Sequence, residues 1–348
     1  MAEKETTHFT NTGEVLLEVK NLKKYFPIEQ GFMHKKIGEV KAVDDVSIYI
    51  NRNETLGLVG ESGCGKTTLG RCIMRAVEST SGEILFHLDA KKPPVNILGL
   101  DKKELLDIRR NMAIIFQNPY SSLDPRMTIL DIVGEPLYLN GYSRDQITDR
   151  VKELMSMVGL ESKFLNRYPH AFSGGQRQRI GIARALALKP RFIVSDEAVS
   201  ALDVSVQAQI LNLLQDLKET MQPTFLFIAH DLSVIEHVSD RVGVMYVGRL
   251  MELAPTEEIY LKPRHPYTEA LLSAIPRPEP GPKKDRILLP GEVANAADLP
   301  PGCCFHPRCR YCQDRCKTEV PPWQEVSFGH YVSCHRADDL ELQGVIER

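Results

Sequence analysis

Residues 60–68 carry the residue types and the spacing that a triphosphate site requires. They read GESGCGKTT and lie between an apolar run, residues 55–59, and a run of helical spacing that follows. Glycines let successive backbone N–H groups surround phosphate oxygens, and the start of a helix adds partial positive charge. Lys66 would bind the β- and γ-phosphates, and the Thr67 hydroxyl would bind Mg²⁺. The segment therefore predicts a nucleoside triphosphate site rather than a plain glycine-rich helix cap.

Two single polar residues follow apolar, strand-like runs further along the chain. Gln117 follows residues 112–116, and His230 follows residues 224–229. In open α/β sheets, ligands bind at the carboxyl ends of the parallel strands. Gln117 can offer its carbonyl to Mg²⁺ and its amide to an attacking water. A lone histidine is more often structural, but its place at a strand end favours a ligand role for His230.

An acidic pair follows a third strand-like run, residues 191–195. The pair consists of Asp196 and Glu197, and residues 200–203 separate it from the next helical run. In such an arrangement the first carboxylate holds the Mg²⁺ shell and the second polarises water. Glu197 is therefore the candidate general base.

A second segment suited to phosphate binding lies at residues 172–176, which read FSGGQ and open a helical run to Leu188. Ser173 is a good N-cap, and the two glycines after it expose the first N–H groups of the helix. One nucleotide does not need two such helix starts from distant parts of one chain. We therefore expect two copies of the domain to share each site, with an ordinary glycine-rich helix start as the alternative.

Two aromatic residues, Tyr25 and Phe26, precede a polar, glycine-containing insert over residues 27–40. Adenine recognition needs mainly a flat apolar partner, which either ring would supply. A core aromatic at the end of a strand is an equally good interpretation of the same residues.

The composition is that of a globular protein long enough for two domains. The chain has 348 residues, of which 43% are hydrophobic and 26% charged. A net charge of −3 and a pI near 6.4 give no general attraction to nucleic acid or anionic lipid. No stretch approaches the roughly 18 apolar residues of a membrane span, and the N-terminus has no apolar signal region. We therefore expect a protein of the cytosol.

The other periodic runs indicate an α/β fold with a helical insertion. Residues 15–20 and 46–50 alternate apolar and polar residues, as strands of a half-exposed sheet do. Residues 128–139 and 145–158 have the spacing of amphipathic helices.

The C-terminal part differs in composition. Prolines flank one short amphipathic run, residues 267–275, which marks a linker to a small unit. Six of the eight cysteines lie in that unit, and in a reducing compartment such clustering favours metal over disulfides. They are Cys303, Cys304, Cys309, Cys312, Cys316 and Cys334.

The order of these segments resembles that of the ATP-binding subunits of ABC transporters. Residues 117–125 (QNPYSSLDP), 167–170 (RYPH), 265–268 (HPYT) and 302–309 resemble the dipeptide, oligopeptide and nickel importers within that superfamily. The resemblance covers nearly the whole chain. It implies an α/β P-loop NTPase core of the ABC ATPase type with an antiparallel β subdomain and a helical subdomain, plus a small cysteine-rich C-terminal domain. The expected ATP-binding domain spans residues 1–262, with the helical subdomain at about 118–185, and the extension spans residues 263–348.

The resemblance also implies a role for each candidate residue. Glu197 would be the base, His230 the γ-phosphate sensor and Gln117 the residue that couples to Mg²⁺. Mg²⁺ would be held by Thr67, Gln117 and Asp196. The nucleotide-binding residues would be Phe26, Gly60, Ser62, Gly63, Gly65, Lys66, Thr67, Thr68, Gln117, Asp196, Ser173, Gly174, Gly175, Gln176 and Asp203.

Four of the clustered cysteines match an iron–sulfur site found in some members of this family. They are Cys303, Cys309, Cys316 and Cys334, whereas Cys304 and Cys312 lie where other residues are usual. Four thiolates suit a 4Fe-4S cluster, and they also suit zinc; a site that binds no metal is the third alternative. Nothing nearby resembles a phosphate or water activator, so a structural or assembly role is expected, with ATP hydrolysis surviving deletion from Arg264 onward.

The partners implied are those of an importer for dipeptides or oligopeptides. They are a second ATP-binding subunit, forming a heterodimer, two membrane-spanning permease subunits and an extracytoplasmic solute-binding protein that acts through the permeases, with no nucleic acid. The chain would then lie at the cytoplasmic face of the cell membrane as a peripheral subunit.

Three alternatives stay open. An importer of nickel or another small solute would carry the same motifs, and a soluble ABC ATPase acting on nucleic acid or ribosomes is a different class. That class uses long coiled coils or two cassettes, and this chain has neither. A metal-sensing regulator driven by the cysteine segment is the third.

Two departures from the family pattern leave every reacting group in place: Phe172 replaces Leu, and Ala198 replaces Pro.

Overall fold

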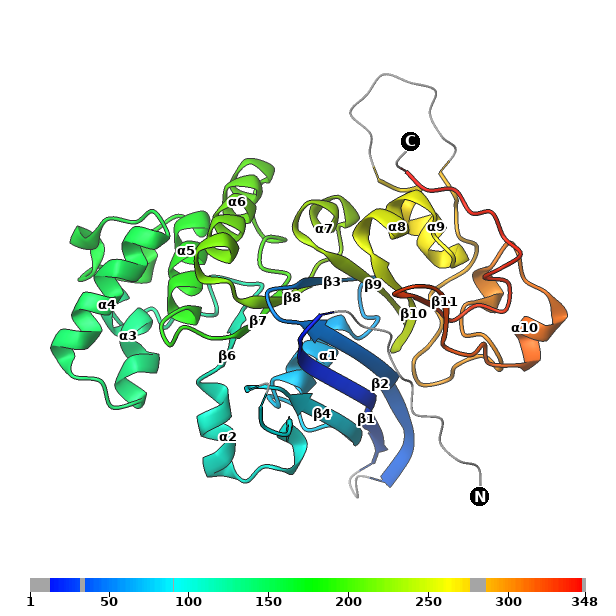
Figure 1. The fold of residues 1–348 in the computed structure, drawn as a ribbon, viewed down its shortest axis with the longest axis horizontal. Coiled ribbons are helices and arrows are strands. Elements are labelled where there is room, and N and C mark those ends of the chain that lie inside the picture. The colour runs from blue at the N-terminus through cyan, green and yellow to red at the C-terminus, as the bar shows by residue number, and fades with distance from the viewer. Residues whose placement is uncertain (1–12, 32–34, 90, 276–285, 346–348) are drawn as a thin grey trace. The chain divides into compact units, whose positions relative to one another are not determined.

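The computed structural model describes residues 13–31, 35–89, 91–275 and 286–345. The chain forms two compact units, and Figure 1 labels the helices and strands of both. Residues 1–99 and 230–348 make up the first unit, and residues 100–229 make up the second. Within the described ranges, no helix is long and apolar enough to cross a membrane.

The first unit contains an antiparallel sheet of four strands in the order β2-β1-β4-β5. They are β1 (Val15–Gln30), β2 (Lys35–Asn51), β4 (Ser81–Phe86) and β5 (Val95–Asn96). β1 and β2 pair from Val15 opposite Asn51 to Gln30 opposite Lys35. The sequence predicted much shorter strands here. The pairing continues into the polar insert because backbone hydrogen bonds join its two arms, although their side chains stay largely exposed.

A second sheet in the same unit has the strand order β11-β12-β10-β9-β3. These strands are β3 (Thr55–Val59), β9 (Arg241–Tyr246), β10 (Arg249–Pro255), β11 (Gln324–Ser327) and β12 (His330–Val332). β3 and β9 are parallel, whereas β9 and β10 form an antiparallel hairpin through Gly248. β12 pairs with β10, so the segment that follows the cysteines continues this sheet.

The helices of the first unit are short. They are α1 (Lys66–Ile73), α7 (Leu232–Val238), α8 (Thr256–Leu261), α9 (Pro266–Leu272) and α10 (Asp314–Thr318), with 3-10 turns at Ile97–Gly99 and His306–Arg308. Buried Glu252 on β10 ties several of these pieces together. Its carboxylate accepts hydrogen bonds from the N–H groups of Arg264 (2.6 Å) and His265 (3.1 Å) and lies 2.7 Å from Nε2 of His330. The start of α9 and strand β12 are thereby both fixed to β10.

The second unit has a parallel sheet in the order β8-β7-β6, made of β6 (Met112–Ile115), β7 (Phe192–Asp196) and β8 (Thr224–Ile228). Every residue of β7 and β8 is buried, as expected for apolar strands covered on both faces. Its helices are α2 (Lys102–Arg109), α3 (Ile129–Leu139), α4 (Arg144–Met157), α5 (Gly174–Ala185) and α6 (Val204–Met221), with 3-10 turns at Ser162–Phe164 and Pro169–Ala171. α3 and α4 confirm the two predicted amphipathic helices, and α3, α4 and α5 pack against one another.

Candidate functional site

The predicted phosphate loop lies between strand β3 and helix α1, as its sequence indicates. Gly60, Gly63 and Gly65 all have positive φ, at 149°, 79° and 106°. A Cβ on Gly60 would lie 2.1 Å from the carbonyl oxygen of Met245, and one on Gly65 would lie 2.0 Å from that of Ala42. Glycine is therefore required at both positions by conformation and by space. Ser62 and Gly63 are exposed, so the loop is open to solvent at its centre.

Lys66 is folded back into this loop. Its side chain is buried, and Nζ donates to the carbonyl oxygens of Gly60 (2.7 Å) and Glu61 (3.1 Å). Nζ also lies 3.7 Å from Sγ of Cys64, a thiol whose pKa is raised by burial. The ammonium thus has carbonyl partners that phosphate oxygens of a nucleotide could replace. Thr67 and Thr68 follow at the start of α1 and are half-buried.

The two aromatic candidates for adenine differ in their surroundings. The Tyr25 hydroxyl donates to Asp44, which also pairs with Arg249 at 2.7 Å, so Tyr25 belongs to a polar network. Phe26 keeps 39% of its surface exposed, with Nζ of Lys24 4.6 Å from its ring centre. An exposed ring on a paired strand is available for stacking, which favours Phe26 over Tyr25 for this role.

In the second unit, two of the predicted residues are in direct contact. Nε2 of Gln117 donates to Oε2 of Glu197 at 2.8 Å and lies 3.4 Å from Oγ of Ser200. Glu197 has a φ of 48°, in the left-handed region, and its N–H donates to the carbonyl oxygen of Ile228 at 3.0 Å. Asp196 is buried at the end of β7. The amide and the candidate base are thus held together at the carboxyl edge of this parallel sheet.

The FSGGQ segment forms the start of α5 through a capping box. Oγ of Ser173 accepts from the N–H of Gln176 (3.3 Å), and Oε1 of Gln176 accepts from the N–H of Ser173 (3.1 Å). Gly175 lies close to α6, since a Cβ there would meet Val206 at 2.5 Å. Gly174 has more room, with its nearest neighbours at 3.5 Å. Both side chains of the box are therefore used within the helix start, which remains exposed to solvent at Ser173.

Two further predicted residues lie at helix starts. Asp203 is the N-cap of α6, where Oδ1 accepts from the N–H of Val206 (3.0 Å) and the hydroxyl of Ser205 (2.7 Å). These hydrogen bonds lower the pKa of the Asp203 carboxyl, the one from Ser205 most. His230 is exposed and follows β8 in sequence, just before α7.

The predicted residues divide between the two units. The phosphate loop, Phe26 and His230 belong to the first unit, and Gln117, Asp196, Glu197, Asp203 and residues 173–176 belong to the second. Their joint service to one nucleotide stays a prediction. Sequence reasoning missed Glu61, Tyr267 and Arg308 in the first unit, where Tyr267 and Arg308 each contact Glu61. Two sequence features could have drawn attention to them: Tyr267 belongs to the HPYT segment, and Arg308 immediately precedes Cys309.

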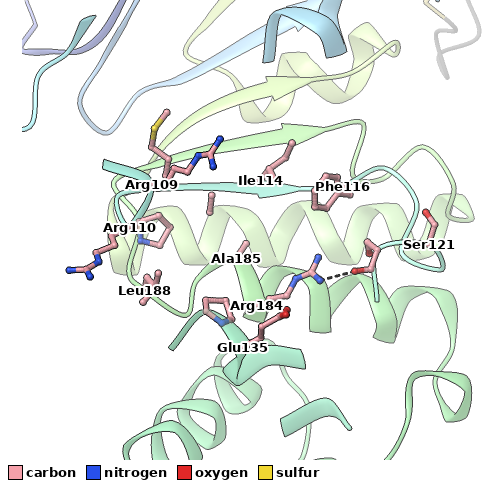
Figure 2. Close-up of a pocket in the computed structure, with 14 residues that line it drawn as sticks. Arg109, Arg110, Ile114, Phe116, Ser121, Glu135, Arg184, Ala185 and Leu188 are labelled. Carbon is pink, nitrogen blue, oxygen red and sulfur yellow. Dashed lines mark hydrogen bonds between the residues drawn. The ribbon is translucent and has the colours of Figure 1, made fainter. Parts of the chain in front are cut away.

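A groove of about 540 Å³ in the second unit contains none of the predicted residues. Figure 2 shows it between β6, α3 and α5, with Arg184 donating to the carbonyl oxygen of Ser122 at 2.7 Å. Its charged lining residues are Arg109, Arg110, Arg184 and Glu135. Phe116, which also lines it, immediately precedes Gln117.

The prediction of a metal site at the cysteines is not supported as it was made. Among the described residues, no group of three or more His, Cys, Asp or Glu side chains is arranged to hold a metal ion. Four thiolates on one zinc ion lie about 2.3 Å from the metal and therefore converge closely. The four cysteines matched by the family pattern instead line one small cavity of about 20 Å³: Cys303, Cys309, Cys316 and Cys334.

The two other cysteines of this segment do not line that cavity. Cys304 is buried elsewhere, and Sγ of Cys312 donates to the carbonyl oxygen of Gln313 at 3.4 Å. Burial raises the pKa of the Cys303 and Cys334 thiols to about 11 and that of Cys309 to about 12. Thiolates at these positions would therefore need a positively charged group between them.

Two family models match the chain. A model described as ABC transporter matches residues 43–200, and one described as oligopeptide/dipeptide transporter, C-terminal region, matches residues 251–316. The first match includes the phosphate loop and the acidic pair after β7. The second includes α9 and five of the six clustered cysteines, all except Cys334.

Three relatives are similar to this chain over most of its length. The oligopeptide transport ATP-binding protein AppF of Bacillus subtilis is 49% identical over 325 residues, 92% of this chain and 97% of that protein. A probable peptide ABC transporter ATP-binding protein of Sinorhizobium fredii, y4tS, is 49% identical over 93% of this chain and 90% of its own. A putative peptide import ATP-binding protein of Brucella ovis is 47% identical over 93% of this chain and 99% of its own.

Solved structures share the fold. The dimeric ATP-binding cassette MJ0796, in a post-hydrolysis state bound to ADP and Pi, matches with a TM-score of 0.60 and 29% identity, over 69% of this chain and 99% of its own. CbiO1 from Clostridium perfringens matches with a TM-score of 0.59 and 24% identity over 71% of this chain and 91% of its own. The fold is thus that of an ABC ATPase, and with relatives nearly half identical over nine-tenths of its length, the chain belongs to the oligopeptide and dipeptide family of ABC transporter ATP-binding subunits.

Proposed function

We propose that this chain hydrolyses ATP to drive the import of peptides through a membrane transporter. The observation that carries the proposal is the phosphate loop, with glycines at the positions where a side chain would clash and Lys66 placed inside it. The relatives named for oligopeptide transport and peptide import give the cargo class. An importer of nickel or another small solute, or a soluble ABC ATPase, is less well supported by those relatives.

The proposed roles of the site residues follow the chemistry of their side chains. In the first unit, Lys66 and the loop amides bind the phosphates, Thr67 binds Mg²⁺, and Phe26 stacks on adenine. In the second unit, Asp196 holds the Mg²⁺ shell and Glu197 activates water, with Gln117 orienting both. The contact between Gln117 and Glu197 supports this last assignment.

Replacing Lys66 by alanine is expected to weaken MgATP binding by at least about tenfold. The change removes the ammonium that would neutralise β- and γ-phosphate charge. Isothermal titration of the full chain measures the dissociation constant. Lys20→Ala is the matched control, because Lys20 lies on β1 of the same unit and pairs with Glu18 at 3.2 Å, outside the loop. Equal ATP affinity for Lys66→Ala and the wild-type protein would remove the loop from nucleotide binding and with it the proposal.

The partners we propose are those of a peptide importer. They comprise a second ATP-binding subunit, two permease subunits and an extracytoplasmic binding protein, with this chain as a peripheral subunit at the cytoplasmic face of the membrane. Support comes from the relatives, which are named as ATP-binding proteins of transport systems, and from the dimeric state named for MJ0796.

We further propose a small C-terminal region around a 4Fe-4S cluster held by Cys303, Cys309, Cys316 and Cys334. The support is that these four, and neither Cys304 nor Cys312, line one cavity. Such a cluster would stabilise the fold of the segment, since 3-10 turns and the five-residue helix α10 supply little core of their own.

Serine substitutions test the cluster. Each of the four cavity-lining cysteines, changed singly to serine, should lower iron and sulfide content in protein purified without oxygen and lower the melting temperature by several degrees. Cys312→Ser is the control, because its thiol does not line the cavity and donates to the neighbouring carbonyl oxygen of Gln313. The wild-type protein should be brown. A colourless protein with stoichiometric zinc would show that the site binds zinc and not a cluster. Loss of iron in Cys312→Ser equal to that in the other four variants would contradict the ligand assignment.

A further inference from the structure

The second residue of the phosphate loop is held by residues from the C-terminal part of the chain. Glu61 contacts Tyr267 on α9 and Arg308 in the 3-10 turn directly before Cys309. All three belong to the first unit. Tyr267 is fully buried and Arg308 is 7% exposed, so both residues that contact Glu61 are buried.

The contact between Arg308 and Glu61 is a two-pronged ion pair. Nη1 lies 2.7 Å from Oε2, and Nη2 lies 3.2 Å from Oε1. This fork geometry is specific to arginine and fixes both side chains in orientation. Nε of Arg308 also donates to the carbonyl oxygen of Pro290 at 3.4 Å, and the guanidinium lies 6.0 Å from the ring centre of Tyr246. The arginine therefore also contacts residues outside the loop.

Tyr267 fixes the backbone of the same loop residue. Its hydroxyl accepts the N–H of Glu61 at 3.0 Å and lies 3.4 Å from Oε2 of that residue. The ring packs against Tyr246 and Phe305, with ring centres 4.9 and 5.3 Å away. The first amide after Gly60 is thereby directed to the phenol, and a rigid aromatic cluster sets the phenol's position.

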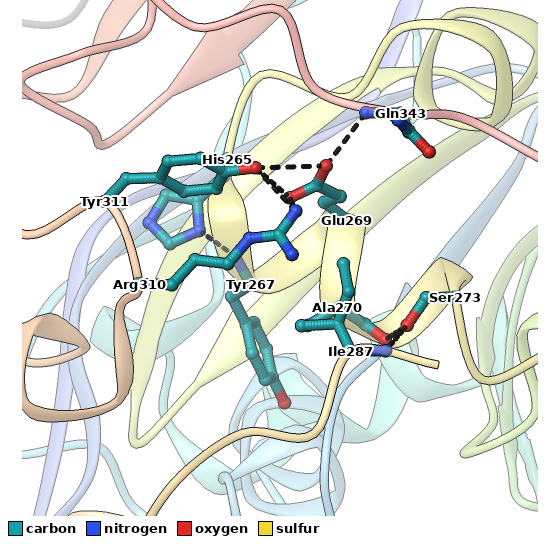
Figure 3. Close-up of polar contacts among 9 residues, drawn as sticks. All are labelled: His265, Tyr267, Glu269, Ala270, Ser273, Ile287, Arg310, Tyr311 and Gln343. Carbon is teal, nitrogen blue, oxygen red and sulfur yellow. Dashed lines mark hydrogen bonds and ion pairs between the residues drawn. The ribbon is translucent and has the colours of Figure 1, made fainter. Parts of the chain in front are cut away.

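Helix α9, which carries Tyr267, is itself anchored to the cysteine segment (Figure 3). The buried carboxylate of Glu269 bonds Nη2 of Arg310 (3.0 Å), the Tyr311 hydroxyl (3.1 Å) and the N–H of Gln343 (3.0 Å). In Figure 3 the Tyr267 ring points away from this cluster. Residues 310–311 therefore hold one side of the helix while Tyr267 on another side reaches the phosphate loop.

The helix start depends on a neutral histidine. Nδ1 of His265 accepts the N–H of Tyr267 at 3.0 Å, and burial lowers the pKa of His265 to about 4, with Glu252 opposing the shift. The ring therefore stays uncharged, and able to accept this bond, at every pH above about 5. The hydrogen bond that fixes the start of α9 therefore does not depend on pH near neutrality.

These contacts have an electrostatic consequence for the loop. A glutamate in a phosphate loop repels a triphosphate, and that repulsion is reduced when a buried guanidinium neutralises the carboxylate. The glycines around Glu61 also leave the loop free to change conformation unless it is fixed from outside. We propose that Arg308 and Tyr267 are positioning residues for the phosphate loop, so that the C-terminal segment sets the affinity for MgATP.

This inference rests on the proposed function of the loop as an ATP site. It also reverses one expectation from the sequence, that hydrolysis survives deletion from Arg264 onward. That deletion would remove both Tyr267 and Arg308 and leave Glu61 with neither partner.

The test measures the MgATP dissociation constant of full-length variants by isothermal titration. Arg308→Met should bind about tenfold more weakly than wild type, and Tyr267→Phe, which keeps the ring and loses the hydroxyl, about threefold more weakly. Arg315→Met is the matched control. Arg315 lies on α10 of the same segment and pairs with Glu319 at 2.7 Å in an exposed position, so its loss should leave affinity unchanged.

A rescue distinguishes positioning from general destabilisation. Adding Glu61→Gln to Arg308→Met removes the unpaired carboxylate and should restore most of the lost affinity, although it restores no ion pair to the fold. Melting temperatures and circular dichroism check that each variant is folded. Wild-type protein that binds no MgATP would refute the proposed function. Folded Arg308→Met and Tyr267→Phe with affinities within twofold of wild type, or an absent rescue, would overturn the positioning role; if Arg308→Met does not fold, Tyr267→Phe alone decides.

Discussion

Glu197→Gln is expected to keep MgATP affinity near that of the wild-type protein and to lower hydrolysis by about a hundredfold or more. The variant loses the carboxylate that would take the proton from water. Its amide oxygen can still accept the hydrogen bond that Nε2 of Gln117 now donates at 2.8 Å, so the local geometry should persist. ATP should then accumulate in a long-lived dimer, because binding proceeds and the chemical step does not.

The measurement is phosphate release from the assembled transporter, combined with size-exclusion chromatography in the presence of MgATP. Glu161→Gln is the control, since Glu161 is an exposed residue of the same unit that pairs with Lys163 at 2.6 Å. Glu161→Gln also replaces a carboxylate by an amide, but outside the acidic pair, so this variant should hydrolyse ATP normally. Rapid turnover by the Glu197→Gln complex would exclude Glu197 as the general base.

The parts of the site that could be predicted from the sequence are those fixed by local interactions. The phosphate loop needs glycines because of its own φ angles and close neighbours, and a strand and a helix flank it in sequence. The start of α5 is likewise encoded within four residues, because Ser173 and Gln176 satisfy each other's backbone N–H groups. Such features follow from short-range rules, and the structure confirms both elements.

The contacts that could not be predicted join residues far apart in the sequence. Arg308 lies 247 positions from Glu61, and no periodicity or spacing relates them. The extension of β1 over residues 27–30 and of β2 over residues 35–40 was also missed. Polar residues there gave no alternating pattern, yet backbone pairing alone forms the two arms.

The cysteine segment shows a third limit. The family pattern separated four cysteines from two, and the cavity separates the same four from the same two. The family pattern did not indicate that this segment shares a unit with the phosphate loop. It also did not indicate that β12, which follows the cysteines 303–316, pairs with β10. A region that is rich in proline and poor in core residues appears independent in sequence, because its partners are strands and side chains from elsewhere in the chain.

Ser173→Arg is expected to abolish hydrolysis of the ATP bound to the neighbouring subunit of an assembled dimer, while leaving ATP binding by the single subunit near wild type. The reason is the proposed sharing of sites, in which the start of α5 acts on nucleotide bound to the neighbouring subunit. An arginine there removes the N-cap hydroxyl and places a long cation at an exposed helix start. The loss of the cap should lower the free energy of unfolding by only about 1 kcal/mol, too little to unfold the domain.

The chain offers a matched control for this variant. Ser143 is the N-cap of α4 and forms the same capping box, with Gln146 as its partner. Ser143→Arg should therefore cost similar stability and leave hydrolysis intact. In dimers of one Ser173→Arg and one wild-type subunit, the mutant chain's own nucleotide should still turn over and its partner's should not. Loss of ATP binding by the isolated Ser173→Arg subunit, or equal damage from Ser143→Arg, would show that the helix start serves its own chain's fold and not a neighbour's ATP.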